Sequence, residues 1–433
     1  MPIPASEFLS VEKYELGNGL RVVFSRDHSR PVAAIYVIYG VGARSEQRGR
    51  TGFAHLFEHM MFQGSANAPK GTHFKLVESN GGSLNGSTHP DYTDYFEVLP
   101  SNKLAVGLWL EADRMRGLSI NEANLANQKE AVKQERRLAF DNRPYAIAIL
   151  ERWPELAFRN WANSHSLIGS FADLEAATVD DVTQFFKTYY APNNAVLAIA
   201  GDFQAAEARR LIEAYFSDIE PQAQPRRPDL SEPVQAEPRE ETHRDPLAQV
   251  PAVVVGYPGP ARRTPGYYRL AMLDIVLTAG ESSRFYQRLV KGRKSVIQYE
   301  ANLGWPFAGP SDYRDPGQYA MFLLHHPQVS AGEVVRQVEE EIGAVRDQGV
   351  AEEELARART WLRAARMRQL ESSRARAMLL GQYELLDGQP ELVNTEIGAF
   401  LDVEPGEIQA AAGQYLATQR RSVLEIAPGG GEG

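Results

Sequence analysis

Apolar residues follow two different spacings along the chain, and together they predict a mixed α and β protein. Nearly continuous apolar runs at residues 19–26, 32–43 and 193–203 are typical of buried strands. Residues 52–62 and 121–140 space their apolar positions as a helix does, and a longer helix is expected at roughly residues 352–385. The pattern therefore predicts an α+β fold.

A helix that leads into a buried strand occurs once in each half of the chain. Val182 aligns with Ile408 and Tyr189 with Tyr415, both at an offset of 226 residues, and after one inserted residue 196–199 align with 423–426. Any two helix–strand units could match by chance. The offset is close to half the chain, which favours two domains that arose by internal duplication.

Proline and charged residues dominate the segment between the two copies. Residues 221–246 carry few large apolar side chains, which is typical of an extended linker. We therefore expect an N-terminal domain at residues 1–220 and a C-terminal domain at residues 247–433.

Composition narrows the chemistry that the chain can perform. The net charge of -10 gives no basic surface for nucleic acid, and the absence of cysteine excludes disulfides, thiolate nucleophiles and cysteine-held metals. The chain contains no apolar run of about 18 residues, so no membrane-spanning helix and no membrane partner are expected. The first residues do not resemble a signal segment, so a cytoplasmic location is expected, or a periplasmic one if such a segment was removed.

Residues 52–62, GFAHLFEHMMF, hold the strongest chemical signal. In a helix, His55 and His59 are four positions apart and project from one face, where two imidazoles could clamp a metal ion. Glu58 flanks that face and suits a base that acts on water held by the metal. The alternative, a buried histidine pair without a ligand, requires other hydrogen-bond partners for both rings.

A catalytic zinc site usually takes a third protein ligand and leaves a fourth position for water. The predicted helix that starts at Asn121 offers Glu130 and Glu135 as candidates. The residues alone leave both open.

HLFEH is an inverted HxxEH zinc motif, and it resembles that of the pitrilysin family, which includes insulysin and the mitochondrial processing peptidase. Further blocks agree in order: GGSLNGSTHPDYTDYFEVLP, VKQERR, HSLIGSFADLEAATVDDV and YYAPNNAVLAIAGDF. The resemblance implies two homologous domains, each a mostly antiparallel sheet packed with helices, of which the second is metal-free. It makes His55, His59 and Glu135 the ligands of one Zn2+ and Glu58 the general base of an endopeptidase.

The resemblance also implies how a peptide binds. Relatives hold an extended peptide against an edge strand beside the zinc, in an interdomain or intersubunit chamber, and residues 83–88 with the Asn85-Gly86 pair occupy that position. Small residues let a second backbone approach. A plain glycine-rich loop is the alternative reading.

Two departures from the family pattern bear on activity. Gln128 stands where relatives often carry a glutamate, and we expect it to support the ligands from behind. Active relatives, or their partner subunits, carry an Arg and, seven residues later, a Tyr that contact the substrate carbonyl. Val290 stands at the position of that Arg, although Arg293 and Tyr299 could form a shifted pair. A homologous metal-free partner that supplies the Arg/Tyr pair in a heterodimer is therefore expected, with a homodimer less favoured. A non-catalytic core-type subunit and a peptide-binding protein are the alternatives.

Overall fold

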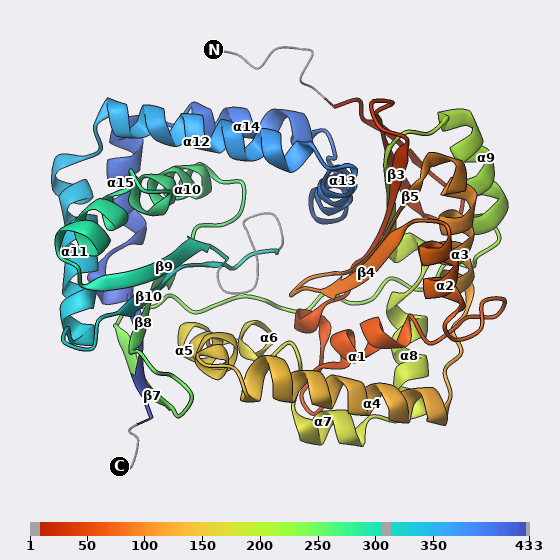
Figure 1. The fold of residues 1–433 in the computed structure, drawn as a ribbon, viewed down its shortest axis with the longest axis horizontal. Coiled ribbons are helices and arrows are strands. Elements are labelled where there is room, and N and C mark those ends of the chain that lie inside the picture. Colours follow the sequence, from red (N-terminus) through yellow and green to blue (C-terminus); the bar gives the residue numbers. More distant parts are fainter. Residues whose placement is uncertain (1–8, 305–312, 430–433) are drawn as a thin grey trace. The chain divides into compact units, whose positions relative to one another are not determined.

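Strands from distant parts of the chain assemble into two mixed sheets (Figure 1). The computed structural model describes residues 9–304 and 313–429. One unit contains the residues up to Gln134 together with Ser166–Pro228 and Met367–Thr395, and the other contains Glu135–His165, Asp229–Arg366 and the residues from Glu396 onward. Each unit is therefore built from several separate stretches of chain.

The first unit is built on a six-stranded sheet with the order β1-β2-β6-β3-β5-β4. β2 and β6 are parallel and the other neighbours are antiparallel, so β4 lies at an edge. Its strands are β1 (Glu12–Glu15), β2 (Arg21–Arg26), β3 (Val32–Tyr39), β4 (Ser83–Thr88), β5 (Thr93–Pro100) and β6 (Ala195–Gly201). Its helices are α1 (Phe53–Met60), α2 (Thr72–Ser79), α3 (Leu104–Arg116), α4 (Glu122–Arg136), α7 (Phe171–Ala176), α8 (Val179–Tyr189), α9 (Ala205–Phe216) and α13 (Ser373–Asp387).

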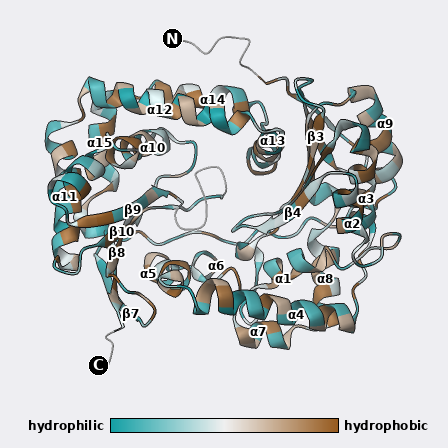
Figure 2. Cartoon of the chain, in the orientation of Figure 1, coloured by the Kyte–Doolittle hydropathy of each residue, from teal (hydrophilic) through white to brown (hydrophobic). Residues whose placement is uncertain are grey.

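Strand β3 shows why its sequence is apolar without alternation. Tyr36 and Ile38 pack against α13, whereas Ile35 faces α3. A Cβ at Gly107 of α3 would lie 2.4 Å from Ile35 Cδ1, so the helix approaches the sheet closely. Burial on both faces removes any reason for polar residues, and Figure 2 shows β3 in the hydrophobic colour while the edge strand β4 is paler.

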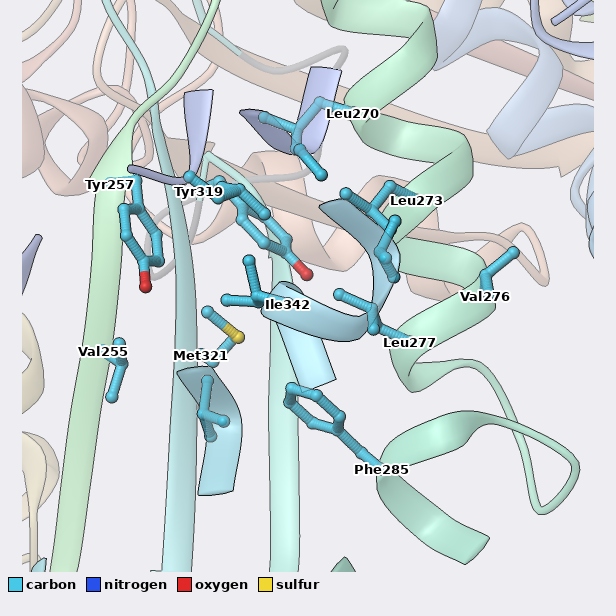
Figure 3. Packing of buried hydrophobic residues seen from close by; sticks show 14 of the residues in the cluster. Val255, Tyr257, Leu270, Leu273, Val276, Leu277, Phe285, Tyr319, Met321 and Ile342 are labelled. Carbon is cyan, nitrogen blue, oxygen red and sulfur yellow. The ribbon is translucent and has the colours of Figure 1, made fainter. Parts of the chain in front are cut away.

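The second unit is built on a five-stranded sheet with the order β7-β11-β8-β10-β9. Its strands are β7 (Arg239–Asp245), β8 (Ala252–Pro258), β9 (Val296–Leu303), β10 (Gln318–His325) and β11 (Ser422–Pro428). Its helices are α5 (Trp153–Ala157), α6 (Trp161–Ser164), α10 (Pro265–Thr278), α11 (Ala331–Gln348), α15 (Pro405–Tyr415) and most of α12 (Glu352–Leu370), while α14 (Leu392–Leu401) spans the boundary between the units. Figure 3 shows its core, where Tyr319 and Met321 of β10 lie among the leucines of α10.

The two sheets share one topology once β1 is set aside. In each, a parallel pair (β2–β6 or β7–β11) is followed by the same antiparallel series. The aligned residues also match in burial, since Val182 and Ile408 are 1% and 0% exposed. This agreement supports the duplication inferred from sequence, and the α+β fold with two mixed sheets is confirmed.

Three local expectations differ from the structure. The helix expected at 352–385 is two helices, α12 and α13, because the Ser372 side chain accepts a hydrogen bond from Ala375 N and starts a new helix. The expected linker 221–246 ends early, since residues 239–245 form β7 on the edge of the second sheet. The expected domains 1–220 and 247–433 are continuous stretches of chain. Helix α13 falls within the second of these stretches, but it buries Leu379 and Leu380 in the core of the first unit.

Within the described residues, no helix combines the length and the apolar character needed to cross a membrane.

Candidate metal centre

Helix α1 carries both histidines of the HxxEH motif, and its start is set by a close backbone contact. Gly52 precedes the helix with a φ of 79°, and a Cβ there would lie 2.5 Å from the carbonyl oxygen of Ile168. Both the left-handed backbone and the contact require glycine. Within the helix, Phe57 packs its ring 4.2 Å from that of Tyr190, which follows α8. The helix is thus held by its apolar face.

Glu46 completes the first turn of α1. Its two carboxylate oxygens accept hydrogen bonds from the backbone N–H groups of Gly52 and Ala54, at 2.9 and 2.8 Å. A negative charge at the N-terminus of a helix also interacts favourably with the helix dipole. Glu46 is buried, so this charged cap is part of the packing that places the two histidines.

His55, His59 and Glu135 meet in space. One ligand atom of each lies within 4.8 Å of the others, and the two imidazole centroids are 4.8 Å apart. Glu135 lies in the last turn of α4, a continuous helix within which the boundary between the units falls. The other candidate, Glu130, has a side chain that is 68% exposed and pairs with Lys133 at 2.8 Å. The geometry therefore favours Glu135 as the third ligand.

These three side chains fit a zinc ion by their chemistry. Two imidazole nitrogens and one carboxylate oxygen are a common protein ligand set of catalytic zinc, which keeps a fourth position for water. Nδ1 of His59 donates to Oε1 of Gln128 at 3.3 Å, and this bond leaves Nε2 of His59 as the nitrogen suited to a metal. Gln128 is buried and donates in turn to Asn127 at 2.7 Å. Gln128 therefore contacts the ring of a predicted ligand.

The side chain of Glu58 extends from α1 to the edge strand β4. The hydroxyl of Thr88 donates to Oε2 of Glu58 at 2.7 Å. A Cβ at Gly86 would lie 3.1 Å from Cγ of Glu58, so the backbone of β4 passes directly beside this side chain. Asn85 is exposed, next to the buried Gly86 in a strand whose successive side chains point to opposite faces. The structure thus brings the predicted base and the predicted peptide strand together.

A second group of metal-binding residue types lies inside the first unit. His73, Glu97 and Glu111 approach one another as closely as the first group does, and all three are buried. Arg114 already occupies this cluster: its Nε donates to Oε2 of Glu111 at 2.9 Å, and its guanidinium lies 4.4 Å from the ring centroid of Tyr95. A positive guanidinium takes the place that a metal ion would need, so we interpret this cluster as a buried ion-pair network.

Protonation states in that network follow from burial. Burial lowers the pKa of His73 to about 3 and raises the pKa of both Glu97 and Glu111. The pKa of Arg114 is raised because attraction to Glu111 and Glu97 outweighs its own desolvation. Two nitrogens of Arg114 donate to Glu111, whereas the guanidinium lies 3.7 Å from the nearest Glu97 oxygen, so we assign the charge to Glu111 and the proton to Glu97.

The residues considered for the Arg/Tyr pair lie in the second unit and bind within it. Val290 packs against the core of that unit. Arg293 pairs with Glu340 at 2.7 Å, and the Tyr299 hydroxyl donates to the carbonyl oxygen of Thr278 at 3.0 Å. Arg293 and Tyr299 thus both have partners on their own unit.

Sequence reasoning missed Glu46, Thr88 and the Arg114 network. Strand alternation places Gly86 and Thr88 on one face, so Thr88 could have been found once α1 was assigned to that face. Glu46 and Arg114 carry no local signal, because their partners are set by tertiary packing.

Two family models match the chain in succession. The model described as Insulinase (Peptidase family M16) matches residues 21–170, and the model described as Peptidase M16 inactive domain matches residues 176–362. The first covers His55, Glu58, His59 and Glu135.

Relatives of known name match over almost the full length. The chain is 26% identical over 422 residues to the zinc protease PqqE of Helicobacter pylori, covering 96% of this chain and 93% of that protein. It is 22% identical to the probable mitochondrial-processing peptidase subunit beta of Schizosaccharomyces pombe, over 92% of this chain and 87% of that protein. The crystal structure of a protease from Helicobacter pylori superimposes with a TM-score of 0.90 at 25% identity, over 97% of this chain and 100% of that chain.

Proposed function

The chain belongs to peptidase family M16, the insulinase family, and from this premise we propose that it is the zinc-bearing subunit of an endopeptidase. The observation that carries the proposal is the convergence of His55, His59 and Glu135 within 4.8 Å, with Glu58 on the same helix as the histidines. Relatives named zinc proteases support it.

The proposed reaction is hydrolysis of a peptide bond. A zinc ion, when bound by the three ligands, would polarise the attacking water and the substrate carbonyl. Glu58 accepts the proton that the water loses as its oxygen bonds to the carbonyl carbon. Glu58 then gives this proton to the amide nitrogen as the C–N bond breaks, so it ends the cycle ionised and ready to act again.

The substrate is proposed to be an extended peptide that adds to β4. This strand ends the sheet, so one row of its backbone N–H and C=O groups has no strand partner in the described sheet. Its small residues allow a second backbone to approach, and main-chain hydrogen bonds would supply much of the affinity. Because the backbone at Gly86 lies beside Glu58, a peptide bound along β4 would lie near this carboxylate.

Replacing Glu58 by Gln tests the proposal. The variant should keep about one zinc ion per chain, because the ligands are unchanged, and should lose at least about a hundredfold in turnover, because the base is gone. Zinc would be measured by mass spectrometry of the metal and turnover with quenched fluorescent peptides. Glu130→Gln, on the exposed face of α4, is the matched control. Wild-type turnover by Glu58→Gln would overturn the assignment of the base.

We also propose that a metal-free homologous subunit completes the site. Val290 leaves no arginine at the family position, and Arg293 and Tyr299 bind to their own unit. Native mass spectrometry of the protein purified from its source cells, with metal analysis of the same sample, should reveal a heterodimer. A homogeneous sample with full peptide turnover would refute the need for a partner.

The same samples separate the rival functions. A core-type subunit would carry no zinc. A peptide-binding protein would carry zinc and bind peptide without cleaving it, even with its partner present.

A further inference from the structure

The side chain of Thr88, on strand β4, forms a hydrogen bond with the proposed base. Successive side chains of a strand point to opposite faces, so Gly86 and Thr88 share the face that meets α1. Thr88 Oγ1 lies 2.7 Å from Glu58 Oε2, a distance typical of a strong O–H···O⁻ hydrogen bond. We propose that Thr88 is a positioning residue that holds the carboxylate of Glu58 in its working orientation. This inference rests on the proposed peptidase function.

The chemistry of the two groups fixes the direction of the bond. An ionised carboxylate can only accept, so the threonine hydroxyl must donate. A glutamate side chain has several rotatable bonds and loses rotamer freedom when it is held in place. A base has to lie within hydrogen-bond distance of the proton that it takes. The bond to Thr88 restricts the carboxylate before the substrate arrives and so favours the reactive geometry.

The backbone around Thr88 gives the hydroxyl a defined position. Thr88 ends β4 and pairs with Thr93 of β5, and the hydroxyl of Thr93 donates to the carbonyl oxygen of Val41 at 2.8 Å. A β-branched side chain has few χ1 rotamers. The register of the edge strand therefore determines where the Thr88 hydroxyl points, which links the strand that would bind the peptide to the group that would take the proton.

Through Thr88, peptide binding to β4 would affect the catalytic step. A peptide that adds to β4 would order the strand through new backbone hydrogen bonds, and Thr88 would pass that order on to Glu58. Binding along the strand, away from the reacting bond, would then raise kcat as well as affinity. A merely structural Thr88 would instead affect folding or zinc content and leave kcat of the folded, zinc-loaded protein unchanged.

The test compares Thr88→Val, which keeps the shape and loses the donor, with Thr88→Ser, which keeps the donor. For the zinc-loaded protein with its natural partners, we expect Thr88→Val to lower kcat about tenfold, as the loss of a charge-assisted hydrogen bond implies, while KM changes less than about twofold. Thr88→Ser should recover most of kcat. Thr93→Val, the same substitution on the paired residue, should lower the melting temperature without a selective loss of kcat.

Zinc content and crystal structures complete the test. All variants should hold the same amount of zinc, and crystal structures of the zinc-loaded proteins should show the Glu58 carboxylate rotated in Thr88→Val and unmoved in Thr88→Ser. Unchanged kcat in Thr88→Val, an equal loss of kcat in Thr93→Val, or a loss of zinc in Thr88→Val would each overturn the inference. If wild type cleaves no peptide, the proposed function fails, and an unmoved carboxylate in Thr88→Val would then overturn the positioning role by itself.

Discussion

Replacing Arg114 by Met should destabilise the first unit far more than replacing Glu97 by Gln. Arg114 is 1% exposed and is the positive member of the network formed with His73, Glu97 and Glu111. Methionine fills similar volume without charge, so Arg114→Met would leave the Glu111 carboxylate buried without a counter-charge. Glu97→Gln keeps a neutral polar group where we assign a protonated carboxyl.

The magnitude follows from the contacts of Arg114. Removing one partner of a buried ion pair costs about 3–5 kcal/mol of unfolding free energy. The guanidinium also lies 4.4 Å from the centroid of Tyr95, and a desolvated contact of this kind contributes up to about 2 kcal/mol. We expect a loss of about 4 kcal/mol for Arg114→Met, and of less than about 1 kcal/mol for Glu97→Gln, whose side chain can still donate a hydrogen bond.

The assay has to report on the first unit alone. Hydrogen–deuterium exchange of peptides from β5, followed along a urea titration, measures unfolding where the network lies. Arg116→Met is the matched control, because Arg116 forms an exposed pair with Asp218 and should contribute less than about 1 kcal/mol. The charge assignment would be refuted if Arg114→Met unfolded like wild type, or if Glu97→Gln were equally destabilising.

Two further predictions concern the second unit and the metal ligands. Burial raises the pKa of Asp274 to about 7, whereas an unfolded Asp titrates near 4, so the folded protein should lose more than about 1 kcal/mol of stability as the pH rises between these values. Asp274→Asn should abolish this loss. The prediction would be contradicted if the melting temperatures of wild type and variant changed by the same amount between pH 5 and pH 8. Gln128→Ala should weaken zinc binding about tenfold in competition with a chelator, because His59 loses its acceptor. Equal zinc affinities of Gln128→Ala and Glu130→Ala would contradict this role.

Much of the fold could be predicted where the signal is local. Helices α1 and α4 begin within one or two residues of the positions expected from spacing and capping, and the Asn121 side chain accepts the predicted capping bond from Asn124 N. The prediction of one long helix was wrong at Ser372. The apolar periodicity continues across this residue, although its side chain caps the start of a new helix. The placement of α13 on the first sheet could not be predicted, because an apolar helical face does not by itself specify which sheet it packs against.

The sequence by itself determined the chemical identity of the candidate site. The spacing within HLFEH places His55, Glu58 and His59 on one short helix whatever the rest of the chain does, because a helix turns by a constant angle per residue. The family resemblance then singled out Glu135.

Only the tertiary structure decided which side chains support those residues. The cap from Glu46 and the bond from Thr88 to Glu58 both depend on contacts between separate elements of the chain. Such contacts follow from how whole elements pack, and no local period encodes them. Of these, the hydroxyl of Thr88 matters most, because it places the base of the proposed reaction under the control of the edge strand.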